Sequence, residues 1–296
     1  MSQINSGKKI VFYVILLSFS NSASDLIIKL LASVPPLQII SIRYLICSIV
    51  LFFVVLPMLN ISGFFIERTT SVLICLTCVS TMIAAICWTI SLMYLPLICA
   101  PFFSLLVPIF ALGIAASMME KNLHTNWLYC ICSLIGAFFI AYDMLLDTKL
   151  ILDFKFNIFY IFILLASSFF FAISDVLNKK ILNSINTELL MFILSASLTI
   201  VSYIISFKNW IFLDIKEVLL LILLGLINII IFSAILNILN IASFSQSSPY
   251  RYTEILFSGI FSSVFFNYSP NLFFYIGSLL IVIGTYKVSQ HLEMDK

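Results

Sequence analysis

Charge is what this sequence lacks most. Asp, Glu, Lys and Arg make up 9% of its 296 residues, whereas soluble domains carry roughly 25%. Hydrophobic residues make up 62%, and the mean hydropathy is +1.19. This composition predicts an integral membrane protein with no sizeable domain in water. It argues against a protease, a nucleotidase or a nucleic-acid-binding protein, because their sites lie mostly on water-facing loops, which this chain scarcely has.

Residues that carry catalytic chemistry are also scarce. The only two histidines, His124 and His291, fall in a loop and a tail, so no intramembrane base, H-E-x-x-H zinc site or Ser-His pair can be assembled. The pattern G-x-x-x-x-G-K-[ST] is absent, which argues against an ATP-driven pump. The seven cysteines lie in apolar segments and are interpreted as packing residues. We therefore predict no enzyme activity and no metal or other cofactor.

Long apolar runs dominate the sequence. A membrane-spanning helix needs about 20 residues, and the runs predict ten such helices, at 10–32, 37–57, 71–93, 97–119, 126–145, 158–181, 188–207, 218–240, 247–267 and 272–290. Pro108 lies within the fourth run and predicts a kink there. The predicted fold class is thus an all-α integral membrane protein, embedded in the lipid bilayer as its surrounding partner.

The two halves of the chain, 1–150 and 151–296, resemble each other. Ser24-Asp25 with Lys29 recurs 150 residues later as Ser174-Asp175 with Lys179. Because each half has five spans, an odd number, the second half must enter the membrane from the opposite side, as in the inverted repeats of secondary transporters. Eight Lys and Arg residues fall on the side of the membrane that contains the N-terminus, and four fall on the other side. Because cytoplasmic loops carry an excess of Lys and Arg, this count predicts that both termini are cytoplasmic.

Among the charged residues inside the predicted spans, six demand an explanation. A charge at the bilayer centre costs about 2.5 to 3.5 kcal/mol on insertion scales, so such residues mark function by default. They are Asp25, Lys29, Arg43, Asp175, Arg251 and Glu254.

Two acid and lysine pairs, Asp25 with Lys29 and Asp175 with Lys179, are each spaced four residues apart and share a helix face. Each pair can neutralise itself and hold its helix to a neighbour. Alternatively, the pairs form gates or line the substrate path. Both interpretations stay open, and a lysine near a helix end can also extend to the interface.

The ninth span contains the densest polar group. Pro249-Tyr250-Arg251-Tyr252-Thr253-Glu254 is predicted to place a cation, an anion and two aromatic rings on about one helical turn. Arg251 and Glu254 can pair with each other as a structural lock. If they instead face a cavity, they suit a zwitterionic ligand, with Tyr250 and Trp88 of the third span available for stacking.

The arrangement resembles the EamA branch of the drug/metabolite transporter superfamily over nearly the whole chain. The residues that carry the resemblance are Ser24 to Lys29, Trp88-Thr89 with Pro96, Asp175 with Asn178-Lys179-Lys180, and Pro249 to Arg251 with Glu254. Within the family, this pattern is most similar to S-adenosylmethionine uptake transporters of obligate intracellular bacteria. Glu120 resembles an acid that the superfamily often has after the fourth span, but Asn267-Tyr268 after the ninth span departs from the pattern.

The resemblance implies a secondary transporter of the bacterial inner membrane that moves S-adenosylmethionine, with S-adenosylhomocysteine as the exchange partner. Arg251 would hold the substrate carboxylate. Glu254 with Asp25 or Asp175 would hold its ammonium or sulfonium, and Trp88 or Tyr250 its adenine. A transporter of amino acids or other small metabolites is the alternative, since the site would look much the same. A membrane scaffold is a third reading, which the intramembrane charges and the repeat argue against.

Overall fold

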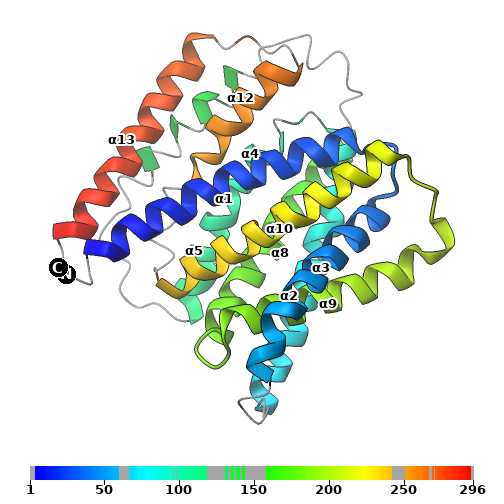
Figure 1. Cartoon of the computed structure of the whole chain (residues 1–296). Coiled ribbons are helices and arrows are strands. Elements are labelled where there is room, and N and C mark those ends of the chain that lie inside the picture. Colours follow the sequence, from blue (N-terminus) through cyan, green and yellow to red (C-terminus); the bar gives the residue numbers. More distant parts are fainter. Residues whose placement is uncertain are drawn as a thin grey trace.

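The computed structural model describes most of the chain. The described residues are 4–59, 67–95, 97, 99–118, 131–132, 135–136, 138–140, 142–143, 158–241, 251–266, 269 and 271–294. The helices, shown in Figure 1, are α1 (Ile4–Leu30), α2 (Pro36–Leu59), α3 (Arg68–Tyr94), α4 (Cys99–Ser104), α5 (Leu106–Met118), α8 (Ile158–Ile181), α9 (Thr187–Ser206), the short η1 (Phe207–Asn209), α10 (Ile215–Ile241), α12 (Glu254–Phe266) and α13 (Leu272–Met294). No strand occurs among these residues.

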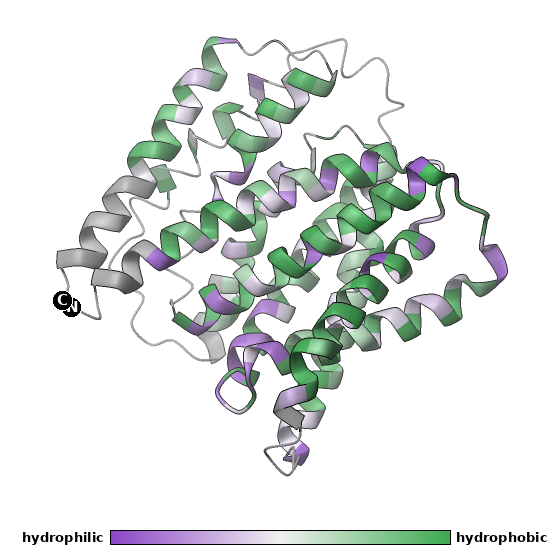
Figure 2. Cartoon of the chain, in the orientation of Figure 1, coloured by the Kyte–Doolittle hydropathy of each residue, from purple (hydrophilic) through white to green (hydrophobic). Residues whose placement is uncertain are grey.

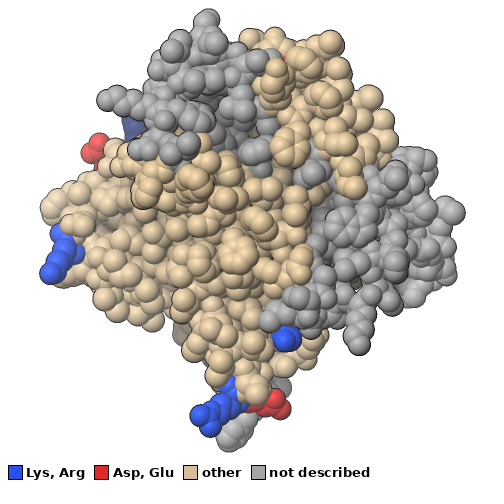
Figure 3. Space-filling view, turned by 180° about the vertical axis from the view of Figure 1, so that it is seen from behind, with Lys and Arg blue, Asp and Glu red and all other residues tan. Residues whose placement is uncertain are grey.

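Six of the described helices are long and apolar enough to cross a membrane. They contain the spans Lys9–Leu30, Pro36–Pro57, Arg68–Tyr94, Phe159–Ile181, Thr187–Asn209 and Ile215–Ile241. Their outer surfaces are apolar: Phe53 on α2 is 68% exposed and Ile204 on α9 is 69% exposed. Hydrophobic colouring runs along these helices in Figure 2. In Figure 3, the described part of the visible face is almost free of charge, and its few charged side chains lie near its edges. The predicted all-α membrane fold is therefore confirmed.

Helices from the first half of the chain pack against helices from the second half. α3 lies along α8, α2 along α9, and α1 along α10. Small and hydroxyl side chains bring α3 and α8 together: the Ser167 hydroxyl donates to the carbonyl oxygen of Ala84 at 2.7 Å, and the hydroxyls of Thr81 and Ser174 lie 2.7 Å apart. Such contacts are the usual means of joining helices in lipid, where apolar burial gives no preference for protein over acyl chains.

The fourth predicted span differs from the prediction. Instead of one helix with a kink at Pro108, the chain forms α4 and α5 with a break at Leu105. A proline inside a helix lacks the N–H for the backbone bond, and its ring clashes with the carbonyl group four residues earlier, which here belongs to Ser104. Ending α4 at Ser104 removes this conflict and leaves Pro108 in the first turn of α5, where proline is tolerated.

The ninth predicted span also differs from the prediction. The described chain turns at Tyr252 and Thr253, and α12 begins at Glu254, so Arg251 and Glu254 do not share one regular helical turn. Contacts with α1 hold this turn: the hydroxyls of Thr253 and Ser18 lie 2.9 Å apart, and the Ser22 hydroxyl donates to the Glu254 carbonyl oxygen at 3.0 Å. These tertiary hydrogen bonds join the start of α12 to α1.

Gly136 and Gly277 mark a close approach of two segments far apart in sequence. A Cβ atom added at Gly136 would lie 2.6 Å from the Gly277 carbonyl oxygen, whereas a Cβ added at Gly113 would meet nothing within 4 Å. We expect Gly277→Ala to lower the unfolding temperature in detergent, because the added Cβ atom would push apart the two backbone segments that contain Gly136 and Gly277. Gly113→Ala, the matched control within α5, should leave it unchanged or raise it, since alanine favours helix interiors over glycine. Equal effects would contradict this packing.

Candidate functional site

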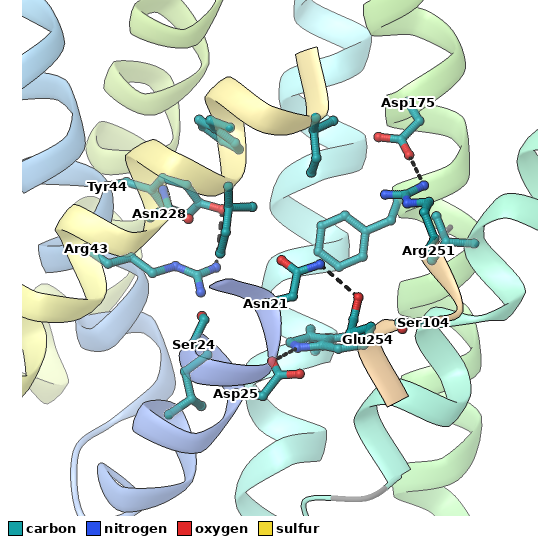
Figure 4. A pocket seen from close by; sticks show the side chains of 17 residues that line it. Asn21, Ser24, Asp25, Arg43, Tyr44, Ser104, Asp175, Asn228, Arg251 and Glu254 are labelled. Atoms are coloured by element: carbon teal, nitrogen blue, oxygen red, sulfur yellow. Dashed lines mark hydrogen bonds and ion pairs between the residues drawn. The ribbon is translucent and has the colours of Figure 1, made fainter. Parts of the chain in front are cut away.

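A cavity lies where the helices of both halves converge. Its volume is about 110 Å³. Its walls come from α1, α2, α3, α4, α5, α8, α10, Arg251 and the start of α12 (Figure 4). The polar residues that line it are Asn21, Ser24, Asp25, Arg43, Tyr44, Ser104, Asp175, Asn228, Arg251 and Glu254. Charged and amide groups therefore surround a space inside a membrane protein, where such groups are costly unless they have a task.

Two carboxylates in this cavity have unused oxygen atoms. Asp25 on α1 accepts a 2.9 Å hydrogen bond from the indole Nε1 of Trp88 on its Oδ1, and its Oδ2 is buried without a partner. Glu254 accepts a 3.0 Å hydrogen bond from the Asn21 amide on its Oε2, and its Oε1 is buried without a partner. Both residues are only 4% exposed. Each carboxylate thus accepts a hydrogen bond on one oxygen, and its other oxygen has no hydrogen-bond partner among the described residues.

A third carboxylate, Asp175, is engaged by an arginine. Its Oδ2 lies 2.9 Å from Nη1 of Arg251, and the two side chains are 8% and 16% exposed. The sequence suggested Arg251 with Glu254, or Asp175 with Lys179, as pairs. The structure instead joins Arg251 to Asp175, because the turn at residues 252–253 separates Arg251 from α12 and directs it toward α8. This pair stands on one side of the cavity in Figure 4.

Lys29 does not pair with Asp25 as the spacing suggested. Its ammonium donates to the carbonyl oxygens of Leu92, Met93 and Leu95 at 3.1, 3.1 and 2.8 Å. These carbonyls lie at the end of α3, where the last residues of a helix lack backbone donors and a cation is favourable. Lys29 is thereby a helix cap that joins α1 to α3. Lys179 lies in the last turn of α8, half-buried, and does not line the cavity.

The sequence-based candidates are partly brought together. Asp25, Trp88, Asp175, Arg251 and Glu254 all line the cavity, whereas Tyr250 lies outside the described residues. Trp88 also contacts Phe171 of α8 edge to face, with ring centroids 5.9 Å apart.

Several lining residues were not assigned to the site from sequence, namely Asn21, Ser24, Tyr44, Asn228 and Arg43. Only Arg43 gave a usable signal, as a charge within an apolar run. No group of three or more His, Cys, Asp and Glu residues in the described part of the chain could hold a metal ion.

Comparisons with known proteins agree with this architecture. Residues 158–290 match the model of the EamA-like transporter family. The chain is 26% identical over 198 residues to the S-adenosylmethionine uptake transporters of Rickettsia prowazekii (strain Madrid E) and Rickettsia bellii (strain RML369-C). The match covers 67% of this chain and 65% of each relative, slightly less than two thirds of their length. A solved structure described only as "Crystal structure of protein" shares the fold, with a TM-score of 0.72 and 14% identity over 98% of both chains.

These matches make the chain similar to membrane transporters. More particularly, residues 158–290 are similar to the EamA-like transporter family.

Proposed function

We propose that this protein moves S-adenosylmethionine across the bacterial inner membrane, with S-adenosylhomocysteine as the exchange partner. The observation that carries the proposal is the pair of carboxylates in the cavity, Asp25 and Glu254, each with a buried oxygen that has no hydrogen-bond partner among the described residues. S-adenosylmethionine has two cationic groups, an ammonium and a sulfonium. One carboxylate for each cation would compensate both charges inside a cavity with little water.

An aromatic surface beside these acids supports the same ligand. The Trp88 indole lies against Asp25 and lines the cavity, and an indole face can stack on an adenine or attract a cation. We propose Trp88 for the adenine, with Tyr250 as a second candidate. Arg251 and Asp175 are proposed as a neutralised pair that shapes the cavity wall. This differs from the role of carboxylate anchor that the resemblance suggested for Arg251.

The transport cycle is proposed to be alternating access by two inverted five-helix repeats, residues 1–150 and 151–296, with both termini in the cytoplasm. The helix pairing supports this symmetry. In the proposed repeat, α1 corresponds to α8, α2 to α9, and α3 to α10. The contact between α1 and α10 therefore has its equivalent in the contact between α8 and α3, and the contact between α2 and α9 is its own equivalent. The cavity between the halves would then open to either side as one repeat moves against the other.

The alternative substrate class is a zwitterionic amino acid or similar metabolite. Such a ligand has one cationic group and would leave one of the two carboxylates without a counter-charge. The pair of acids therefore favours S-adenosylmethionine over a simple amino acid. A scaffold without transport activity would tolerate replacement of Asp25, Asp175, Arg251 and Glu254 by neutral residues, whereas a transporter would not.

Uptake of radiolabelled S-adenosylmethionine by bacterial cells that express the protein tests the proposal. The host must have no uptake of its own. We expect saturable uptake that excess S-adenosylhomocysteine blocks and a mixture of amino acids does not. No uptake despite confirmed membrane insertion would contradict the proposed substrate. Uptake blocked by amino acids would instead support the alternative.

A further inference from the structure

Arg43 is a buried cation that lines the cavity from α2. The residue is 6% exposed, and its guanidinium points into the cavity in Figure 4, on the side opposite the Arg251 and Asp175 pair. Its Nη2 donates to the Tyr44 hydroxyl at 3.2 Å, and its Cζ lies 4.7 Å from the centre of the Tyr44 ring. Its Nε is buried without a partner. No carboxylate forms an ion pair with it among the described residues.

This arrangement is energetically unfavourable unless an anion arrives. An arginine cannot give up its proton in a protein, so Arg43 stays charged whatever surrounds it. Of the three carboxylates in the cavity, Asp175 pairs with Arg251, while Asp25 and Glu254 receive hydrogen bonds from Trp88 and Asn21. The Tyr44 ring and hydroxyl offer only weak compensation for a full charge inside a membrane protein.

Asn228 of α10 adds a second free donor near Arg43. Its Nδ2 is buried without a partner, it lines the same cavity, and Figure 4 shows it beside Tyr44 and Arg43. The Arg43 Nε and the Asn228 Nδ2, which have no hydrogen-bond partner among the described residues, are donors for the two oxygens of one carboxylate. The same cavity thus has unused donors on the α2 and α10 side and unused acceptors at Asp25 and Glu254.

We propose that Arg43, assisted by Asn228, binds the α-carboxylate of the transported substrate. This inference rests on the proposed function and extends it. With Arg251 and Asp175 paired, the cavity offers one cation and two carboxylates that form no ion pair among the described residues. S-adenosylmethionine carries the complementary set, one carboxylate and two cationic groups. Arg43 is therefore a determinant of specificity that requires the substrate to have its carboxylate.

Competition by decarboxylated S-adenosylmethionine tests this role, because that compound keeps the sulfonium, the amine and the adenine. In the wild type, both unlabelled compounds should inhibit uptake of labelled S-adenosylmethionine. We expect the decarboxylated compound to be about tenfold to a hundredfold weaker as an inhibitor than S-adenosylmethionine, because it has lost the charged hydrogen bonds of the carboxylate. In Arg43→Gln, the affinity for S-adenosylmethionine should fall by a similar factor, while that for the decarboxylated compound stays within about twofold. The preference for S-adenosylmethionine over the decarboxylated compound should then largely disappear.

The ratio of the two affinities within one variant does not depend on how much protein folds. Arg43→Lys should keep part of the preference, since it retains the charge and loses the planar fork. Arg68→Gln makes the same chemical change at an exposed residue at the start of α3 and should keep the full preference. An unchanged preference in Arg43→Gln would overturn the role of Arg43, as would a wild type without any preference. A wild type that takes up no S-adenosylmethionine would overturn the proposed function and this inference with it.

Discussion

Glu254→Gln is expected to reduce uptake of S-adenosylmethionine by about tenfold or more, and Asp25→Asn by a similar factor, because a charged partner contributes more than a neutral one. Each substitution removes a charge and changes little else. A glutamine oxygen can still accept the 3.0 Å hydrogen bond from Asn21, and an asparagine oxygen the 2.9 Å bond from Trp88. The loss should therefore appear in transport and not in the amount of protein in the membrane. Initial rates of uptake over a range of substrate concentrations, normalised to the membrane level of each variant, measure it.

Matched controls lie on the exposed parts of the same chain. Glu67→Gln just before α3 and Asp214→Asn just before α10 make the same chemical changes at exposed residues outside the cavity. Both should transport at the wild-type rate. If Glu254→Gln and Asp25→Asn also transport normally, these two carboxylates do not bind the cationic groups of the substrate.

The helices themselves could largely be predicted from sequence. Runs at 37–57 and 188–207 correspond to α2 (Pro36–Leu59) and α9 (Thr187–Ser206) within two residues at each end. The reason is physical: backbone groups in lipid must be satisfied within the helix, so an apolar run of sufficient length has one structure available to it. Two helix breaks were not predicted. The break at Leu105 depends on how the chain accommodates the nearby proline, and the turn at residues 252–253 depends on contacts with hydroxyl groups of α1.

The partners of the charged residues could not be predicted in the same way. Spacing within one sequence reveals only contacts inside one helix, and it suggested Lys29 for Asp25 and Glu254 for Arg251. The observed partners, Trp88 for Asp25 and Asp175 for Arg251, lie on other segments.

Arg43 shows the same limit. The helix α2 is strongly apolar, so its sequence pattern does not show that Arg43 reaches a cavity. A charge in an apolar run identified Arg43 as a residue that needs a task, but only the packed helices bring it to the cavity.

Breaking the Arg251 and Asp175 pair is expected to destabilise the protein by about 3 to 5 kcal/mol, the usual cost of leaving one member of a buried ion pair alone. Either Arg251→Gln or Asp175→Asn alone should lower the unfolding temperature in detergent, because each leaves one member of the pair without its partner. The double variant should recover much of the loss, since no charge is then left unpaired. A thermodynamic cycle of the four proteins measures the coupling, and purely additive effects would contradict a pair that neutralises itself.

This prediction separates two aspartates that the proposed repeat makes equivalent. Asp25 and Asp175 occupy matching positions in the two halves, yet Asp175 is held by a guanidinium and Asp25 by a single indole N–H, with its second oxygen unused. Asp175→Asn should thus lower stability and recover when combined with Arg251→Gln. Asp25→Asn should lower transport at near-normal stability. If both aspartates instead affect the same property, the two halves of the cavity are used alike, and the asymmetry of their partners has no role in substrate binding.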